Sequence, residues 1–430
     1  MGLNEGAIAR IQNYRQQAAS LLLYQSVFTS DIGKSLLALL ASFTNEDTIA
    51  CSQAYGQWFS SLALAQQSWP QHLIDRVLAA DNAFSQQSQH LPGSPETSAQ
   101  SVEHVAHDLL NAAEYDFAIL HSFYQLSTKQ LSHWVGQKCD EPAPPAPISL
   151  ISPAQLPSIN EVVTHYRTHG IGIFGQYAAF RWQTHPDRVT GKLIGIPKPD
   201  PIRLSQLVAY DHPKQQLIQN TESLLRGYTA QNVLLYGSRG AGKSSLVKAL
   251  LNEYKSQGLR LIEVPKAHLQ NLPQIIGQLS GVPQKFIIFV DDLSFEEDDE
   301  AFKALKVVLE GGVTARPQNV VVYATSNRRH LVREFFDERP KPKDAEEIQA
   351  WDTVQEKLSF SDRFGLTLTF TPADQPTYLT IVHQLAEQAG LTIDPENLDW
   401  RARQWATRHN GRSGRSARQF IDFLIAEQGD

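Results

Sequence analysis

The stretch NVLLYGSRGAGKSSLVKALL, Asn232–Leu251, decides the fold of this 430-residue chain. Its apolar start predicts a buried strand, its glycine-rich centre a tight turn, and its end a helix with one apolar face. Between strand and helix the residues fit the pattern G-x-x-x-x-G-K-[ST], and that structural context is the one in which the motif binds phosphate. The stretch therefore predicts an α/β fold built around a phosphate-binding loop.

The residue types in this loop explain what it can bind. Glycines let backbone N–H groups turn inward around an anion, and the following helix adds the positive end of its dipole. Lys243 is placed to reach the β- and γ-phosphates of ATP, and the Ser244 hydroxyl to bind Mg²⁺. We expect the segment before the loop, with Val208 and Tyr210, to cover the adenine. The expected phosphate-binding residues are Gly237, Ser238, Arg239, Gly240, Ala241, Gly242, Lys243, Ser244 and Ser245.

A second motif, FIIFVDD, ends an apolar strand with two carboxylates. Asp291 at the strand tip is the predicted Mg²⁺ ligand, together with Ser244. Asp292 is the predicted base that polarises the attacking water. Glu296 and Glu297 remain alternative bases, because the acidic run that contains them follows within a few residues.

Three further polar residues are expected to complete the site. Asn327 ends the strand NVVVYATSN and is placed to lie between γ-phosphate and water, with Thr325 and Ser326 as alternatives. Arg363 stands directly before an apolar turn and strand, where it could act on the phosphate of a neighbouring subunit. Arg415, near the start of a late helix, could reach the γ-phosphate from a helical lid.

The chain is long enough for two or three domains, and its composition changes mark the boundaries. The first part has helical periodicity, a run rich in proline follows, and strands then alternate with helices, which is typical of a parallel sheet covered on both faces. The predicted parts are a helical bundle domain at 1–140, a proline-rich linker at 141–158, a connecting segment with short strands at 159–202, a nucleotide-binding α/β core at 203–371 and a helical lid at 372–430.

Composition excludes several classes of protein. With 42% hydrophobic and 19% charged residues and a net charge of −7, the chain has no global attraction to nucleic acid or anionic membranes. Its two cysteines argue against a disulfide framework and a structural zinc site. No apolar run could span a bilayer and no secretory signal begins the sequence, so we expect a cytoplasmic protein.

The order of these motifs resembles that of the AAA+ ATPases, and within them a bacterial family catalogued only as having a domain of unknown function. The resemblance runs from about Gly170 to Phe423 and rests on GIGIFGQYAAFRW, the phosphate-loop stretch, FVDDLSFEEDD, ALKVVLEGG, VYATSNRRHL, SFSDRFGLTLTF and GRSGRSARQF. It implies a five-stranded parallel sheet of order 5-1-4-3-2. It also implies a sensor 1 residue at Asn327, an arginine finger at Arg363 and a sensor 2 residue at Arg415.

The purpose of ATP hydrolysis has two candidate answers. The first is an oligomeric AAA+ ATPase, most simply a homo-oligomer, that remodels or regulates a protein partner recruited by the helical domain. The alternative is a nucleotide switch similar to helicase loaders and initiators, acting with nucleic acid. Six arginines and no acid between Trp400 and Ile421 support the alternative locally, but we favour the interpretation that they serve the nucleotide and the lid surface. A kinase is less consistent with the sequence, because no phosphoryl-acceptor site is visible.

Overall fold

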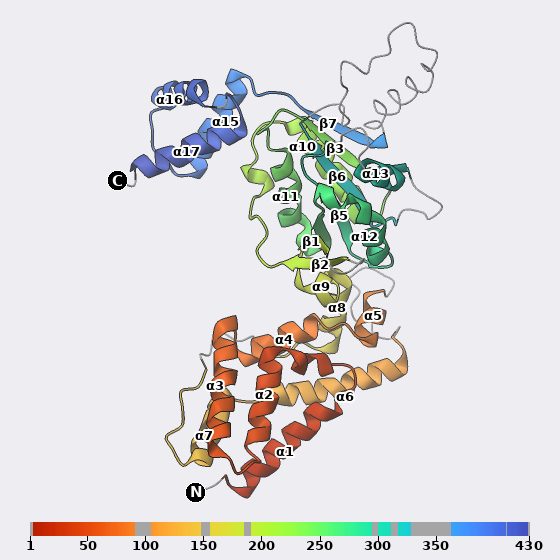
Figure 1. Ribbon diagram of the computed structural model, residues 1–430, viewed down its shortest axis with the longest axis vertical. Helices are drawn as coiled ribbons and strands as arrows, with labels where there is room; N and C mark the ends of the chain where they lie inside the picture. The colour runs from red at the N-terminus through yellow and green to blue at the C-terminus, as the bar shows by residue number, and fades with distance from the viewer. Residues whose placement is uncertain are drawn as a thin grey trace. The chain divides into compact units, whose positions relative to one another are not determined.

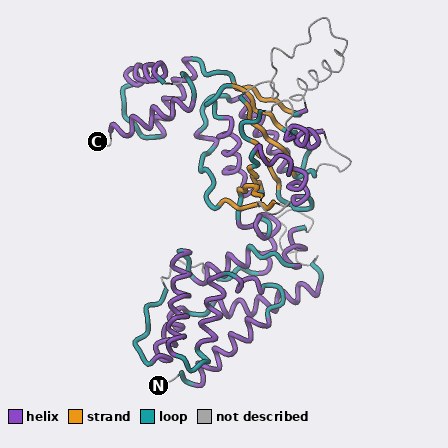
Figure 2. Tube along the Cα trace, in the orientation of Figure 1, coloured by secondary structure: helices purple, strands orange, loops and turns teal. Residues whose placement is uncertain are grey.

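The computed structural model describes residues 3–90, 105–147, 155–184, 191–294, 300–310, 317–327, 363–409 and 411–428. The chain separates into two compact units, Met1–Gln176 and Tyr177–Asp430. Each has its own hydrophobic core. The first is built from helices and the second around a sheet, as the purple and orange segments of Figure 2 show.

The helical unit owes its helix boundaries to capping side chains. Asn4, Ser30, Asp47, Ser68 and Asn82 each accept a backbone N–H from the first turn of the helix that follows. Such caps satisfy amide groups that a helix start leaves without a partner. Its elements are α1 Glu5–Ser20, η1 Gln25–Thr29, α2 Asp31–Ser42, α3 Thr48–Ala65, α4 Trp69–Leu78, α5 Ala83–Gln89, α6 His107–Tyr124, α7 Thr128–Cys139, α8 Ile159–His169 and α9 Gly172–Gln176.

Helix α8 belongs to the core of the helical unit. Val162, Val163 and Tyr166 are buried there, and the Tyr166 hydroxyl donates to the backbone oxygen of Val77 at 2.6 Å. The segment 159–202, expected as one connection, therefore divides: its two helices lie in the helical unit, and its strands join the sheet. The sequence does not reveal this division, because α8 has the same amphipathic pattern whichever core it covers.

The second unit contains a seven-stranded sheet of order β2-β1-β4-β5-β6-β3-β7. All neighbouring strands are parallel except β1 and β2, which are antiparallel. Its elements are β1 Ala179–Thr184, β2 Gly191–Ile196, η4 Leu204–Gln206, α10 Asp211–Leu225, β3 Val233–Gly237, α11 Lys243–Tyr254, η5 Lys255–Gln257, β4 Leu259–Glu263, η6 Lys266–Asn271, α12 Leu272–Leu279, β5 Lys285–Val290, α13 Glu300–Glu310, β6 Val320–Ser326, β7 Leu366–Phe370, α15 Gln375–Gln388, α16 Pro395–Arg408 and α17 Gly414–Gln428.

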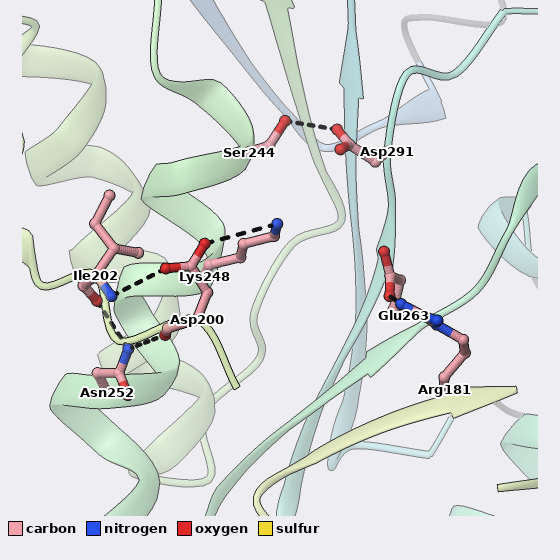
Figure 3. Close-up of polar contacts among 8 residues, drawn as sticks. All are labelled: Arg181, Asp200, Ile202, Ser244, Lys248, Asn252, Glu263 and Asp291. Atoms are coloured by element: carbon pink, nitrogen blue, oxygen red, sulfur yellow. Dashed lines mark hydrogen bonds and ion pairs between the residues drawn. The ribbon is translucent and has the colours of Figure 1, made fainter. Parts of the chain in front are cut away.

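The prediction of a five-stranded sheet is wrong, because β1 and β2 extend it to seven strands. Two glycines in β2 make room for aromatic rings of the β1 segment: a Cβ on Gly191 would lie 2.4 Å from the Trp182 ring, and one on Gly195 would lie 2.1 Å from the Tyr177 ring. Glycine is a poor strand former, so these positions weaken the strand signal in the sequence. Arg181 of β1 also pairs with Glu263 of β4 at 2.8 Å (Figure 3).

Helices cover both faces of this sheet. In Figure 1, α10 and α11 lie on one side of the strands and α12 and α13 on the other. Helices α15, α16 and α17 follow β7 and form a separate cluster around Tyr378, Val382, Ala402 and Phe420. We call these three helices the lid.

The strand register aligns the ends of three strands that carry the predicted site. β3 pairs with β6 so that Tyr236 faces Ser326, and β5 pairs with β6 so that Val290 faces Ala324. The residues after these strands therefore meet at the carboxyl edge of the sheet, where open α/β sheets bind their ligands.

Candidate nucleotide-binding site

A cavity of about 760 Å³ lies between this edge of the sheet, the segment before α10 and the lid. Its volume falls in the range of small-molecule sites, which is about 300–1,000 Å³. The predicted residues that line it are Val208, Tyr210, Arg239, Gly240, Ala241, Gly242, Lys243, Ser244, Ser245, Asp291, Asp292, Asn327 and Arg415. The fold therefore brings residues from five separate stretches of sequence to one cavity.

Lys243, the first residue of α11, is the central cation of the cavity. Its side chain is almost fully buried, and its ammonium donates to the backbone oxygens of Gly237 and Ser238 at 2.9 and 2.8 Å. Burial lowers the pKa of Lys243, while the carboxylates of Asp291 and Asp292 act in the opposite direction. A buried ammonium held mainly by neutral oxygens is well suited to gain from an incoming polyanion.

The glycines of the phosphate loop are required for different structural reasons. Gly242 caps α11 with φ at +85°, and Gly240 has φ at +77°, both in the left-handed region that favours glycine. Gly237 is required for another reason, because a Cβ there would lie 1.9 Å from the Phe370 backbone oxygen of β7. Neither Gly237 nor Ser238 lines the cavity. Their contribution in this structure is to hold Lys243 through their carbonyl groups.

Asp291 collects hydroxyl donors at the tip of β5. The Ser244 hydroxyl donates to its Oδ1 at 2.6 Å (Figure 3), and the Thr325 hydroxyl donates to the same atom at 2.5 Å. Thr325 is level with Asp291 in the register of β5 and β6, and it also accepts the backbone N–H of Asp292 at 2.9 Å. Thr325, an alternative for the sensor position in the sequence, thus contacts the carboxylate of Asp291 and the backbone of Asp292.

Asp292 and Asn327 form a second polar contact at this edge. The Asn327 amide nitrogen donates to Asp292 Oδ1 at 2.6 Å, and the Asn327 amide oxygen accepts from the Lys243 ammonium at 3.2 Å. Asp292 has φ at +51°, a left-handed conformation that is uncommon for a residue other than glycine. One amide therefore connects the predicted base to the phosphate-loop lysine.

The lid contacts the phosphate loop directly. The backbone N–H of Arg415 donates to the Gly240 backbone oxygen at 3.3 Å, and Arg418 and Gln419, one turn further along α17, also line the cavity. A Cβ on Gly240 would lie 2.9 Å from the Ser413 hydroxyl, so this loop glycine also permits close approach of the lid. Arg415 and Arg418 thus bring positive charge to the cavity from the lid.

The segment before α10 provides much of the apolar lining. Val208 and Tyr210 both line the cavity, together with Leu207 and Ala209. The Tyr210 hydroxyl donates to the Thr371 backbone oxygen at 2.7 Å, and its ring lies 5.2 Å from that of Phe370. Sequence patterns give no signal for several other lining residues that come from distant elements, namely Ile202, Gln206, Lys214, Ile381, Leu385 and Gln419.

Arg363 does not line this cavity. It precedes β7 by three residues and so lies at the amino end of the strand, whereas the loop residue Gly237 pairs with Phe370 at the carboxyl end. Glu296 and Glu297, the alternative bases, lie outside the described residues.

The donor set fits Mg²⁺ bound together with a phosphate. Ser244 and Asp291 present two oxygen ligands side by side, and Mg²⁺ usually takes one or two protein oxygens and completes its shell with phosphates and water. Among the described residues there is no cluster of three or more His, Cys, Asp or Glu side chains that could hold a metal without such help.

Within the described ranges, no helix is both long enough and apolar enough to cross a membrane.

The α/β fold with a mainly parallel sheet, the phosphate loop and the second carboxylate motif define the class of AAA+ ATPases, and the resemblance seen in the sequence is confirmed. Residues 175–428 match the family described as "Protein of unknown function (DUF815)", and the chain belongs to that family.

Curated relatives match shorter parts of the chain. The replication factor C large subunit of Sulfolobus acidocaldarius is 33% identical over 122 residues, which cover 26% of this chain and 27% of the relative. That of Staphylothermus marinus is 43% identical over 65 residues, or 15% of each chain. That of Methanococcus vannielii is 28% identical over 148 residues, or 32% of this chain and 30% of the relative. The chain thus spans less than a third of each of these relatives.

Solved structures give a weaker likeness. Thermotoga maritima RuvB, described as a Holliday junction branch migration motor, is 14% identical, with a TM-score of 0.33 over 52% of this chain and 72% of the other. A single-residue variant of the same protein has a TM-score of 0.34 at the same identity and coverage.

Proposed function

We propose that this protein binds ATP with Mg²⁺ and hydrolyses it as an oligomeric AAA+ ATPase, in order to remodel or regulate a protein partner. One observation carries the ATPase proposal. Lys243, Asn327 and Asp292 are linked by hydrogen bonds beside the paired Ser244 and Asp291, within one cavity. A polyanion that binds the Lys243 ammonium would compete with the amide oxygen of Asn327 for it. Since the same Asn327 amide donates to Asp292, binding of the anion would also affect the residue that holds Asp292.

In this proposal each residue has a defined task. Lys243, with the loop amides, binds the β- and γ-phosphates, and Ser244 and Asp291 hold Mg²⁺, which when bound neutralises charge on those phosphates. Asp292 accepts a proton from the attacking water, and Asn327 orients both Asp292 and that water. Arg415 stabilises the γ-phosphate from the lid. The strand order β7-β3-β6-β5-β4 supports these roles. When the five strands are counted along the chain, the order corresponds to 5-1-4-3-2, which the resemblance to AAA+ ATPases implies.

The experiment that tests hydrolysis is an isosteric exchange of the base. Asp292→Asn should retain Mg·ATP binding by calorimetry and lower the rate of phosphate release by about 10²–10⁴-fold, the usual contribution of a general base. Asp422→Asn, on the exposed face of α17, is the matched control and should release phosphate at the wild-type rate. A wild-type chain that binds Mg·ATP but releases no phosphate would contradict the enzyme proposal.

The choice between Asp292 and Glu296 as the base follows from a parallel variant. If Glu296→Gln lowers phosphate release while Asp292→Asn does not, the base is Glu296 and Asp292 only positions Asn327. Because both exchanges remove one charge and preserve side-chain shape, the comparison isolates the protonatable oxygen.

The oligomer proposal is supported by the position of Arg363. It lies at the opposite edge of the sheet from the phosphate loop in its own chain, a position that favours action on a neighbour's nucleotide rather than its own. Arginine supplied in trans raises phosphoryl-transfer rates by about 10³–10⁵-fold. Residues that act across subunits leave the affinity for ATP largely intact when removed, because binding is completed within one chain.

Mixing of variants tests this arrangement. Arg363→Ala should lose hydrolysis and keep its ATP affinity, and adding Lys243→Ala chains should restore part of the activity at shared interfaces. Arg226→Ala, an exposed arginine just after α10, is the control and should behave as the wild type. Hydrolysis that is independent of protein concentration, with no rescue in the mixture, would contradict the oligomer.

The helical unit is proposed to recruit the protein partner. It has its own core, formed by residues of α1 to α8, and contributes none of the cavity residues. A separately folded unit can hold a partner while the ATPase unit changes state. Pull-down with Met1–Gln176, compared with the intact chain, should capture the same protein. Capture only by Tyr177–Asp430 would contradict this part of the proposal.

The nucleic-acid alternative has less support in the structure. Its local basis is the arginine-rich lid, yet Arg401 pairs with Glu427, Arg403 with Asp399 and Arg412 with the amide of Gln375. These arginines are thus engaged within the lid, and Arg415 and Arg418 line the cavity. Filter binding to single- and double-stranded DNA at low salt tests the alternative, because phosphate contacts by lid arginines would give affinity that falls steeply with salt.

A further inference from the structure

The segment 200–210, which we call the strap, is tied to two different helices by two side chains. It runs from the end of the β1–β2 hairpin region to α10 and contributes six cavity-lining residues. Asn252 of α11 and Lys214 of α10 hold it through backbone oxygen atoms. Neither residue is part of the phosphate loop or of the carboxylate motif.

Asn252 fixes the first part of the strap. Its amide nitrogen donates to the backbone oxygens of Asp200 and Ile202, both at 2.8 Å (Figure 3). The Ile202 backbone N–H in turn donates to the Asp200 carboxylate at 3.2 Å, and Lys248 lies 3.9 Å from that carboxylate. The strap is thereby attached to the same helix that begins with Lys243 and Ser244.

Lys214 fixes the second part. Its ammonium donates to the backbone oxygens of Leu204 and Leu207 at 2.6 and 3.1 Å. One carbonyl belongs to the first residue of η4 and the other to the residue after it, so a single ammonium links the two ends of η4. Hydrogen bonds from a charged donor are stronger than those from a neutral donor, and a carbonyl pair has no charge to neutralise the ammonium. The charged ammonium of Lys214 thus binds two backbone carbonyl oxygens of the strap.

The residues that follow have a conformation that needs such support. Ala209 and Tyr210 have φ at +67° and +61°, two consecutive left-handed residues without a glycine. L-residues disfavour this conformation, which persists only where the surroundings hold it. Val208 and Ala209 pack against the lid core, while Leu207 and Tyr210 pack against the sheet core. The strap therefore joins the lid to the sheet at the cavity.

The apolar lining has the character of a nucleobase site. Ile202, Leu207 and Val208 of the strap line the same cavity as Ile381 and Leu385 of α15. Aliphatic side chains from two elements suit the two faces of a flat aromatic base, whereas the phosphate loop and the carboxylates provide only polar contacts. Placement of the strap therefore bears on the base and not on the phosphates.

We propose that Lys214 and Asn252 are positioning residues that hold the strap in the shape that binds the base of a nucleoside triphosphate. This inference rests on the proposed ATPase function. It predicts a loss that depends on the ligand: variants without these hydrogen bonds bind Mg·ATP more weakly and bind inorganic tripolyphosphate as before, because tripolyphosphate makes no use of the strap.

Calorimetry with the full chain separates these outcomes. Lys214→Met and Asn252→Leu should each weaken Mg·ATP by about tenfold and change the affinity for Mg·tripolyphosphate by less than about twofold. Lys214→Arg keeps a charged donor and should recover most of the ATP affinity. Asn220→Leu is the matched control: it removes similar bonds on α10, to the Gln231 backbone and the Tyr323 hydroxyl, and should not alter the ratio of the two affinities.

The outcomes that overturn the inference are distinct from failure of the proposed function. Equal weakening of both ligands, unchanged ATP affinity in both variants, or the same selective loss in Asn220→Leu would show that the strap is not what these residues serve. A wild-type chain that binds ATP no more tightly than tripolyphosphate would also overturn it. Failure of the wild-type chain to bind either ligand would instead contradict the ATPase proposal itself.

Discussion

Each of the two units buries a charged side chain, and the two charges differ in the partners that hold them. In the helical unit, Asp116 of α6 is fully buried and accepts the backbone N–H groups of Leu22, Leu23 and Tyr24 at 2.7–2.9 Å. In the sheet unit, Lys243 is nearly as buried, but it opens onto a cavity and is held by oxygens that a ligand could replace. The first charge is satisfied within the fold, and the second is kept for a partner.

The difference has a physical basis. Asp116 accepts N–H groups from the segment between α1 and η1, so the carboxylate supplies the acceptor for backbone donors that precede the first turn of η1. Burial lowers the pKa of Lys243, and the carboxylates of Asp291 and Asp292 offset this effect only in part, so a bound anion would stabilise the ammonium further. A buried charge with complete partners indicates stability, whereas one with exchangeable partners indicates function.

Removal of Lys243 is expected to have the largest effect. Lys243→Ala should lower ATP turnover by about 10²–10³-fold or more, as expected for loss of a preorganised donor to the phosphates. Thermal stability should remain close to that of the wild type, because the substitution also removes a costly buried charge. Lys255→Ala, an exposed lysine just after α11, should leave turnover unchanged. If Lys243→Ala kept its turnover and lost stability, the lysine would be structural like Asp116.

Removal of Asp116 should have the opposite profile. Asp116→Ala leaves the backbone N–H groups of Leu22, Leu23 and Tyr24 without their acceptor and should destabilise the helical unit by about 3 kcal/mol. Hydrogen exchange at Leu22–Tyr24 should accelerate, while ATP turnover stays at the wild-type rate. Glu114→Ala on the exposed face of α6 is the control and should change neither property. A loss of turnover with intact exchange protection would break the comparison between the two units.

The helical unit should also depend on pH through His72. Burial, with the nearby Arg76 charge, lowers the pKa of His72 to about 4 from 6.5. The unfolded chain therefore binds the proton more readily, so stability is complete above about pH 6.5 and is lost as the pH falls toward 4. The loss at pH 5 is about 2 kcal/mol. Denaturant unfolding at pH 7 and 5 should show it, His72→Gln should remove this dependence, and the exposed control His133→Gln should retain it.

A smaller effect is expected at Thr325, whose hydroxyl bonds the carboxylate of Asp291 and the backbone N–H of Asp292. Thr325→Val removes the hydroxyl that bonds Asp291 and accepts from Asp292. The Mg²⁺ concentration for half-maximal ATP turnover should rise by about tenfold, which is typical when a group that supports a metal ligand is lost. Thr325→Ser keeps the hydroxyl and should restore the wild-type value. An unchanged Mg²⁺ requirement in Thr325→Val would show that Asp291 does not need this support.

Short motifs made much of the site predictable from the sequence. Lys243 and Ser244 follow a glycine turn between strand and helix, and Asp291 and Asp292 directly follow an apolar strand. Because parallel strands end at the same edge of a sheet, residues that follow these strands can be expected to lie close together even when the packing is not known. The helical character of the first part of the chain follows from periodicity in the same way.

Other features depend on which distant segments meet. The contact of Thr325 with Asp291 follows from the register of β5 and β6, and the need for glycine at Gly237 follows from the approach of β7. Strand β2 pairs with β1, and its glycines admit aromatic rings of the β1 segment, a feature that weakens the strand signal of β2 itself. Such contacts are selected by the global packing and leave no local periodicity in the sequence.

By itself, the sequence determined the phosphate loop, the carboxylate pair and the alternation of strands and helices, because each is encoded within a few neighbouring residues. Only the tertiary structure decided that Asp116 completes a backbone segment more than ninety residues away, and that Lys214 and Asn252 hold the strap. The physical reason is the same in each case: the partner of a buried polar group is whatever the fold brings within about 3 Å of it.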